Sequence, residues 1–285
     1  MQSPTKRKET GILICYRIKF YAVGLRKLSP TYGGLTNVLV INISLAKKFA
    51  FFIVTLILSM KVCALPTLLP VPHNLIAFNS PAGIKLFNKS QHKTAFWELI
   101  PYFTTEKGVA FCGVAASVMV LNAVNIKPPI TPSHSPFYIF NQDNFFTESV
   151  LKVITPAEIN SKGATLSQIA QSLKTFNIFV KMYHGREEGM DKKLFRRLAI
   201  GAVSSSHKFI IVNFCRKYIK EQGCGHFSPL AAYNAKADRF LLLDVARYKY
   251  LPVWIKTDEL YQSLSKGNDP VAHKSRGFII VSSKG

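Results

Sequence analysis

The sequence predicts an α+β domain in which a helical front half packs on an antiparallel sheet. Hydrophobic residues make up 48% of the 285-residue chain and charged residues 18%, so a sizeable core can be buried. Helical patterns occupy the chain up to about residue 199, and short β-branched and aromatic runs begin at about residue 209. The 16 glycines and 15 prolines follow no period, and five cysteines are few for this length. Collagen-like, low-complexity and disulfide-built classes are therefore excluded.

The front half is expected to hold helices over 90–99, 111–123, 165–176 and 191–199. The run 111–123 is apolar throughout and too long for most strands, so it indicates a buried helix that starts at or near Cys112. Thr165 and Gln168 fit a capping box, which marks a helix start. The Pro-rich segment 65–81 is expected to be extended, and 127–146 is expected to be a long loop.

The back half is expected to form antiparallel strands over 209–214, 227–233, 240–245 and 277–282. Each run is rich in β-branched and aromatic residues, and turn residues separate the runs.

Residues 45–64 are interpreted as a secretory signal peptide. Lys47 and Lys48 precede the apolar run 49–58, and a small residue, Ala64, ends the segment. Residues 1–44 are then a dispensable leader that follows a start site placed too early, and 65–285 is the functional domain. This interpretation places the domain in the periplasm or outside the cell, with no stable membrane span after processing. A membrane anchor, if the segment is uncleaved, and a buried helix are the alternatives.

The chain is strongly basic, with a formal net charge of +22. Such a charge suits an anionic small molecule, an anionic lipid or nucleic acid. Beyond residue 64 the sequence has no Lys/Arg run longer than two and no RNA-binding signature. We therefore expect no nucleic-acid partner, and a solvated basic surface is the simpler interpretation.

Three polar residues in apolar surroundings suggest a catalytic triad. Cys112 opens the buried helix, His226 enters a strand, and Asp244 follows an apolar run. A thiol at a helix N-terminus is favoured as thiolate. An adjacent imidazole can take its proton and later protonate a leaving amine, and a carboxylate behind the imidazole orients it. Taken singly, the cysteine could equally be a small core residue and the histidine a turn residue.

The other two cysteines of the 65–285 domain, Cys215 and Cys224, form a C-x8-C-x-H pattern with His226. A zinc site would need a fourth ligand and would consume the proposed base, so no metal ligands are assigned. A Cys215–Cys224 disulfide and two free thiols both remain open.

Whole phrases of the sequence resemble the phytochelatin synthases. They are AFCGVA at 110–115 with MVLN at 119–122, GHFSPLAAYN at 225–234 and DRFLLLDVARYKY at 238–250. The resemblance covers about residues 75–283 and implies a papain-like cysteine protease fold. It implies Cys112 as nucleophile, His226 as general base and acid, and Asp244 as the orienting carboxylate. The implied reaction is cleavage of the Cys–Gly amide of glutathione, with transfer of γ-glutamylcysteine to a second glutathione or to water.

Two departures from the family pattern change these expectations. The family places Gln six residues before the nucleophile, as an oxyanion-hole side chain, and this chain has Glu106 there. Glu106 can donate a hydrogen bond only while it is protonated. Plant members carry a further Cys-rich C-terminal region, which is not in this sequence. In this respect the sequence resembles the shorter bacterial members, which tend to favour hydrolysis.

The resemblance also implies the substrate contacts and partners. Arg247 suits a glutathione carboxylate, Asp269 and Arg276 match positions that line the donor pocket, and Tyr250 is assigned to substrate binding as well. No tightly bound cofactor is expected. A thiophilic divalent metal, cadmium or zinc, acts as activator or as its glutathione complex, so the partners are glutathione and metal–glutathione thiolates. A homodimer is one assembly that this interpretation allows.

Two rival functions remain open in the sequence. One is a papain-like cysteine peptidase that acts on other short peptides with the same chemistry. The other is a non-enzymatic protein that binds metal thiolates through its cysteines. Release of glycine from glutathione separates the three hypotheses, because only the first predicts it as the main reaction.

Overall fold

A computed structural model describes residues 68–130 and 135–284, which fall in one compact unit. The expectations for the leader 1–44 and the signal peptide 45–64 lie outside the described residues. The described chain combines helices with a large antiparallel sheet, so the α+β prediction is confirmed.

The main sheet has seven strands in the order β1-β6-β5-β4-β3-β9-β2, and all neighbouring pairs are antiparallel. In that order the strands are Ile76–Ala77, Val253–Lys256, Arg239–Leu242, His226–Asn234, Lys208–Phe214, Gly277–Ser283 and Ile178–His184. A second, two-stranded sheet pairs β7 (Asn268–Asp269) with β8 (Lys274–Ser275).

The four strands expected from the sequence are present as β3, β4, β5 and β9. The run 240–245 differs most at its end, because β5 stops at Leu242 and Asp244 lies in the connection beyond it. Strands β1, β2 and β6 were not expected. β1 has two residues and β6 has four, which is too short for a clear alternating pattern.

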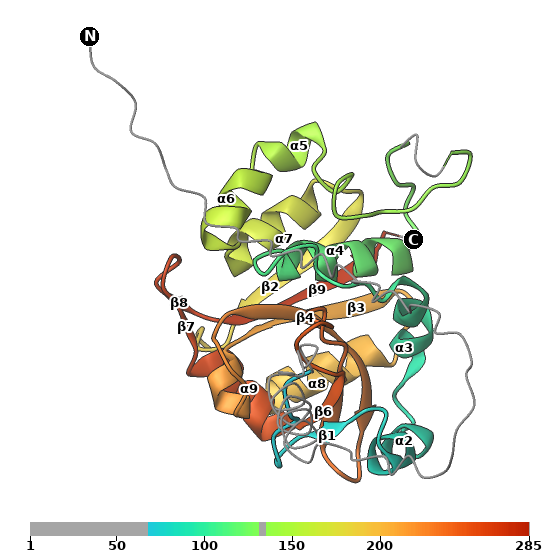
Figure 1. Ribbon diagram of the computed structural model, residues 1–285, viewed down its shortest axis with the longest axis vertical. Helices are drawn as coiled ribbons and strands as arrows, with labels where there is room; N and C mark the ends of the chain where they lie inside the picture. The colour runs from blue at the N-terminus through green and yellow to red at the C-terminus, as the bar shows by residue number, and fades with distance from the viewer. Residues whose placement is uncertain (1–67, 131–134, 285) are drawn as a thin grey trace, which may run out of the picture. The chain divides into compact units, whose positions relative to one another are not determined.

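Helices cover both faces of the sheet. α4 (Cys112–Ala123) and α7 (Leu166–Lys174) lie on one face, and α8 (Lys192–Val203) and α9 (Thr257–Ser265) lie on the other (Figure 1). The shorter helices are α2 (Pro81–Asn88), α3 (Thr94–Leu99), α5 (Glu148–Leu151) and α6 (Pro156–Lys162), with 3₁₀ turns at Ile100–Tyr102 and Arg216–Ile219. The expected helices are confirmed as α3, α4, α7 and α8, whereas α2, α5, α6 and α9 were missed.

The predicted capping box opens α7. The Thr165 hydroxyl accepts from the backbone N–H of Gln168 at 3.2 Å, and the Gln168 side chain accepts from the backbone N–H of Thr165 at 2.9 Å. Both bonds satisfy N–H groups that a helix start leaves without partners.

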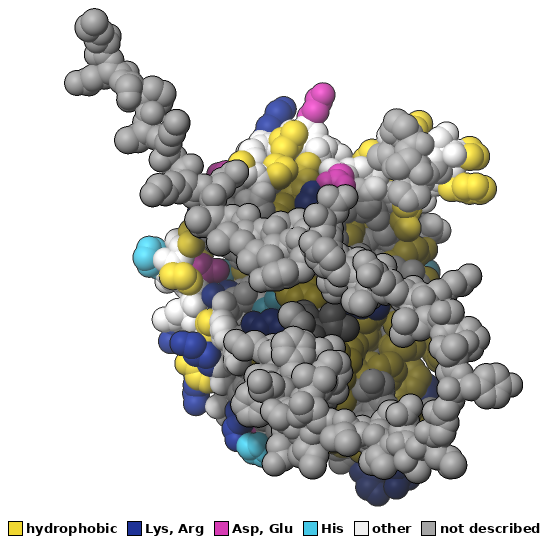
Figure 2. Space-filling view, viewed as in Figure 1, with side chains coloured by type: hydrophobic (Ala, Val, Ile, Leu, Met, Phe, Trp, Pro, Cys, Tyr) yellow, Lys and Arg dark blue, Asp and Glu magenta, His cyan; other side chains and the backbone are white. Residues whose placement is uncertain are grey.

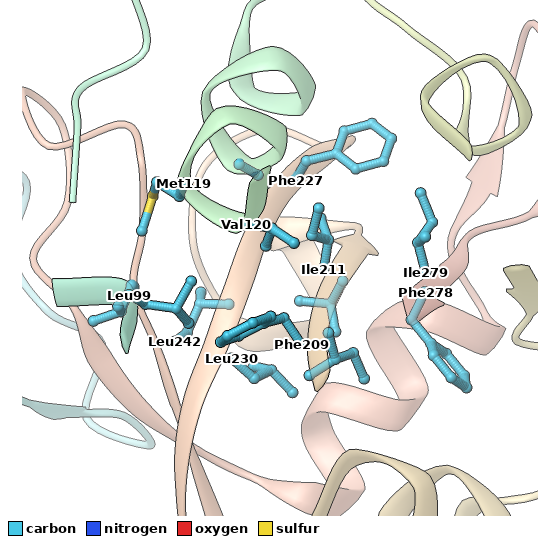
Figure 3. Packing of buried hydrophobic residues seen from close by; sticks show 14 of the residues in the cluster. Leu99, Met119, Val120, Phe209, Ile211, Phe227, Leu230, Leu242, Phe278 and Ile279 are labelled. Atoms are coloured by element: carbon cyan, nitrogen blue, oxygen red, sulfur yellow. The ribbon is translucent and has the colours of Figure 1, made fainter. Parts of the chain in front are cut away.

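The core lies between α4 and the sheet. Every residue of α4 except Asn122 is buried, which explains why the helix is apolar on all sides. Met119 and Val120 of α4 lie over side chains of the sheet such as Ile211 (Figure 3). On β9, Phe278 and Ile279 point to opposite faces, as successive strand residues do (Figure 3).

In the view of Figure 2, Lys and Arg side chains are visible at several places on the described surface. Among the coloured residues of this face, Lys and Arg side chains are spread along the margin. Within the described ranges, none of the helices is both long enough and apolar enough to span a bilayer.

Candidate active site

The candidate nucleophile, Cys112, is the first residue of α4 and is 7% exposed. The buried helix holds it at the edge of the core. There the positive end of the helix dipole stabilises negative charge. Cys112 is a free cysteine, so its sulfur is available for nucleophilic attack.

His226 and Asp244 meet where β4 begins and β5 ends. His226 is the first residue of β4, and Asp244 lies two residues past β5, the antiparallel neighbour of β4. Nε2 of the imidazole lies 2.9 Å from Oδ1 of Asp244. This hydrogen bond leaves Nδ1 of His226 for a reacting group. The structure thus brings together the two residues that sequence reasoning expected on neighbouring strands.

Asp244 is held by a buried ion cluster. Its Oδ1 accepts from the backbone N–H of Ala246 at 2.8 Å, and Nη2 of Arg216 lies 2.7 Å from its Oδ2. Arg216 also pairs with Glu221, and all three charged side chains are buried. Burial alone would raise the pKa of Asp244, but the charges of His226 and Arg216 hold it well below its usual range. Asp244 therefore remains a carboxylate.

The imidazole of His226 is stabilised in its charged form. Burial alone would lower the pKa of His226, whereas the carboxylate of Asp244 and the nearby sulfur of Cys112 raise it to about 9. A charged imidazole can donate a proton to a leaving amine at neutral pH.

Glu106 also lies in this site. It is 5% exposed. A carboxylate oxygen of Glu106, the sulfur of Cys112 and a ring nitrogen of His226 all lie within 4.8 Å of one another. Oε1 of Glu106 accepts a hydrogen bond from the Tyr248 hydroxyl at 2.7 Å, and Oε2 is buried without a hydrogen-bond partner among the described residues. Burial raises the pKa of Glu106, and the hydrogen bond from Tyr248 opposes that rise. The raised pKa extends the pH range over which the carboxyl is protonated, and only the protonated form can donate from Oε2.

A cavity of about 430 Å³ opens beside the nucleophile. This volume is in the lower part of the range of small-molecule sites, roughly 300–1,000 Å³. Its lining includes Cys112, Asn213, Gly225, Phe227, Asp269 and Arg276. Two of the four substrate residues expected from the sequence, Asp269 and Arg276, are therefore at the cavity.

Arg276 is buried beside the cavity with only partial pairing. Its Nη1 donates to Oδ1 of Asn213 at 3.1 Å and lies 3.6 Å from Oδ2 of Asp269, while its Nε has no hydrogen-bond partner among the described residues. Oδ1 of Asp269 already accepts from the backbone N–H groups of Val271 and Ala272. The cavity wall thus carries a guanidinium with spare hydrogen-bonding capacity.

The other two expected substrate residues do not line this cavity. Arg247 is exposed, stacks 4.7 Å from the Phe103 ring and donates to the Phe103 carbonyl. Tyr250 is buried, with the guanidinium of Arg216 4.7 Å from its ring centroid. Its hydroxyl accepts from the backbone N–H of Gln222 at 2.7 Å. Tyr250 thus packs against the ion cluster, where its ring makes a favourable cation–π contact with Arg216.

Cys215 and Cys224 form a disulfide that closes the connection between β3 and β4. Of the two alternatives that the sequence left open, the structure contains the disulfide. A zinc site of these two cysteines with His226 is excluded, because both sulfurs are bonded to each other.

Sequence reasoning missed Arg216, Glu221 and Tyr248. The side chain of Arg216 contacts Asp244, that of Tyr248 contacts Glu106, and that of Glu221 pairs with Arg216. A charged pair five residues apart is ordinary on a surface, and nothing in the local pattern shows that this one is buried.

Comparison with known proteins gives a consistent result. A family model described as phytochelatin synthase matches residues 67–278. The chain is 33% identical over 211 residues to glutathione gamma-glutamylcysteinyltransferase 1 of Arabidopsis thaliana. This match covers 73% of the chain and 41% of the Arabidopsis protein. It is 32% identical over 219 residues to the Lotus japonicus protein of the same name, covering 75% and 42%. It is 25% identical over 219 residues to glutathione gamma-glutamylcysteinyltransferase of Schizosaccharomyces pombe, covering 74% and 50%. The matched region thus spans about two fifths to one half of these relatives.

Proposed function

The chain belongs to the phytochelatin synthase family, and we propose on this premise that it is a glutathione γ-glutamylcysteinyltransferase or hydrolase with Cys112 as its nucleophile. The single observation that supports this most strongly is the convergence of Cys112, His226 and Asp244, with Cys112 in the wall of a cavity. A papain-like fold is part of the proposal, supported by a buried helix that begins at the nucleophile and a sheet that carries the histidine.

The first half-reaction follows from the charges of the site. The Cys112 thiolate attacks the carbonyl carbon of the Cys–Gly amide, and the new S–C bond pushes the carbonyl electrons onto oxygen. Nδ1 of His226 then gives its proton to the glycine nitrogen as the C–N bond breaks. Asp244 holds the imidazole in place throughout, and Arg216 holds Asp244. Glycine leaves, and a γ-glutamylcysteinyl thioester remains.

The second half-reaction reverses the proton transfer. Neutral His226 takes a proton from the amino group of a second glutathione, or from water, as that group attacks the thioester carbon. The Cys112 thiolate is the leaving group. A metal–glutathione thiolate is a suitable acceptor substrate because cadmium and zinc bind thiolates strongly.

Three side chains are assigned to charged groups of the substrate or to the oxyanion that forms during the reaction. Glu106 donates from Oε2 to the oxyanion only in the fraction of molecules in which it is protonated, together with the backbone N–H of Cys112. Arg276 binds a carboxylate of the γ-glutamyl group, because it lines the cavity and its guanidinium is a charged donor that matches a carboxylate. Asp269 is assigned to the γ-glutamyl ammonium.

Export through the segment 45–64 is also proposed, to the periplasm or the cell exterior. The Cys215–Cys224 disulfide supports it, since structural disulfides persist mainly in oxidising compartments.

The test is to incubate the full chain with glutathione, with and without Cd²⁺, and to quantify glycine and thiol products by mass. Glycine release with either γ-glutamylcysteine or longer γ-glutamylcysteinyl peptides supports the proposal. Cys112→Ser should abolish it, and Ser117→Ala, one turn further along the same helix, should not, because Ser117 bonds only the helix carbonyl of Gly113. Faster cleavage of α-linked Glu-Cys-Gly would instead indicate the peptidase. No release from either substrate would contradict both enzyme hypotheses.

A further inference from the structure

Glu106, Cys112 and His226 form a cluster of three potential metal ligands. One carboxylate oxygen, one thiol sulfur and one imidazole nitrogen lie within 4.8 Å of one another, and all three side chains are buried. Zn²⁺ and Cd²⁺ bind this mixture of sulfur, nitrogen and carboxylate donors. The cluster has no signature in the sequence, because His226 lies far along the chain from Glu106 and Cys112.

The outer partners of the cluster match those of a metal site. Metal-binding histidines usually donate their second ring N–H to a carboxylate, and Nε2 of His226 does this to Asp244 at 2.9 Å. Oε1 of Glu106 is fixed by the Tyr248 hydroxyl at 2.7 Å. The remaining atoms, Nδ1 of His226 and Oε2 of Glu106, are therefore the ones left for a cation.

Oε2 of Glu106 is the observation that points most directly to a ligand. It is buried and has no hydrogen-bond partner among the described residues, although buried polar atoms are rarely left in this state. A divalent cation would satisfy this oxygen. Its two positive charges would balance the thiolate of Cys112 and the carboxylate of Glu106.

The fourth coordination position is open to the cavity. Cys112 lines the cavity of about 430 Å³, so water or a thiolate from a small molecule can complete a tetrahedral site. A three-ligand site with one open position is accessible to metal from solution, and an external chelator can remove the metal.

We propose that the substrate-free protein binds one thiophilic divalent cation, Zn²⁺ or Cd²⁺, through Glu106, Cys112 and His226. As the Cys112 thiolate forms a sulfur–metal bond, Nδ1 of His226 and the carboxyl of Glu106 release to solvent the protons that they carry. The metal-bound sulfur can no longer attack an amide. The site is then a reversible inhibitory site for free metal. Excess glutathione removes the inhibition by chelating the metal. The binding stands by itself, whereas the inhibition rests on the proposed function.

The binding test uses the metal-free full chain without glutathione. Cd²⁺ is titrated while the ultraviolet sulfur-to-cadmium charge-transfer absorption is followed. The titration is repeated with Cys112→Ser, so that signal from Cys15 and Cys63, which the full chain also contains, is subtracted. We expect Cys112→Ser to bind one Cd²⁺ fewer per chain than the wild-type chain does. We expect Glu106→Gln to weaken that site at least about tenfold, and Glu188→Gln, an equal charge change at an exposed position, to leave it unchanged.

A second readout identifies the sulfur without relying on activity. Alkylation of Cys112 by iodoacetamide, followed by peptide mass analysis, should be blocked by Cd²⁺ and restored by a chelator. The protection should require a higher Cd²⁺ concentration in Glu106→Gln. Equal Cd²⁺ affinity in wild type and Glu106→Gln, or alkylation that Cd²⁺ does not slow, would overturn the proposal.

The inhibitory consequence is tested separately. Pre-incubation with Cd²⁺ should produce a lag in glycine release that shortens as glutathione is increased, and immediate full activity would contradict inhibition. If no glycine is released under any condition, the proposed function fails, and the titration and alkylation results still decide the metal site.

Discussion

Gly225 is the position where one added carbon should separate backbone strain from damage to the substrate site. It precedes His226 and has φ +80°, a conformation that L-residues with side chains seldom adopt. A Cβ placed there would lie 2.6 Å from Nη2 and 2.9 Å from Cζ of Arg276. Arg276 is itself buried and bonded to Asn213, so the guanidinium has to leave its position.

The expected effect of Gly225→Ala has two parts. The left-handed backbone costs about 1–2 kcal/mol of stability. Displacement of Arg276 removes a hydrogen bond between a charged group and substrate, which is worth about 1.5–3 kcal/mol. Because each 1.36 kcal/mol is a factor of ten, kcat/KM should fall about 10- to 150-fold.

Gly223 supplies the matched control. Its φ is +97°, and no atom lies within 4 Å of a Cβ added there. Thermal unfolding should show a similar loss of stability in Gly223→Ala and Gly225→Ala, whereas glycine release from glutathione should be lost mainly in Gly225→Ala. Equal kcat/KM values for the two variants would refute the assignment of Arg276 to substrate binding.

Three further predictions concern acid–base chemistry and domain boundaries. Asp244→Asn removes the charge that raises the pKa of His226 to about 9, so the fall of kcat/KM at alkaline pH should move roughly 1–3 pH units lower; an unmoved alkaline limb would contradict the assignment. Glu106→Gln should raise the rate at neutral pH about tenfold or more, with a ratio to wild type that grows with pH, because Gln remains a donor where Glu106 ionises; identical pH profiles would remove Glu106 from the oxyanion site. A chain that begins at Leu65 should be soluble and as active as the full chain, and an insoluble product would argue against the signal-peptide interpretation.

The sequence predicted the elements whose pattern is local. The uniformly apolar run of α4 and the capping box at Thr165 each determine a helix without help from distant residues. Helix α9 was missed because it begins at Thr257, directly after β6, and no linker separates the two patterns. Strand β2 was missed because only Ile178 is buried, and its exposed residues, such as Lys181, leave no clear alternating pattern.

The candidate site divides in the same way. Cys112, His226 and Asp244 were predictable because each is a reactive polar group in apolar surroundings. Burial of a polar group is costly, so its presence there indicates a function. Arg216 and Glu221 were not, because only the tertiary fold shows that this pair is buried against Asp244. Tyr250 was assigned to substrate, but its ring packs on Arg216, a contact that no sequence spacing reveals.

The most direct test of the central claim is to detect the acyl-enzyme itself. Wild-type chain is mixed with glutathione, quenched in acid within the first turnover and digested, and the Cys112 peptide is examined by mass spectrometry. The account predicts a peptide heavier by one γ-glutamylcysteinyl group, attached through a thioester that hydroxylamine removes, and absent in Cys112→Ser. Glycine release at the wild-type rate by Cys112→Ser, or an acyl group found on another residue, would contradict it.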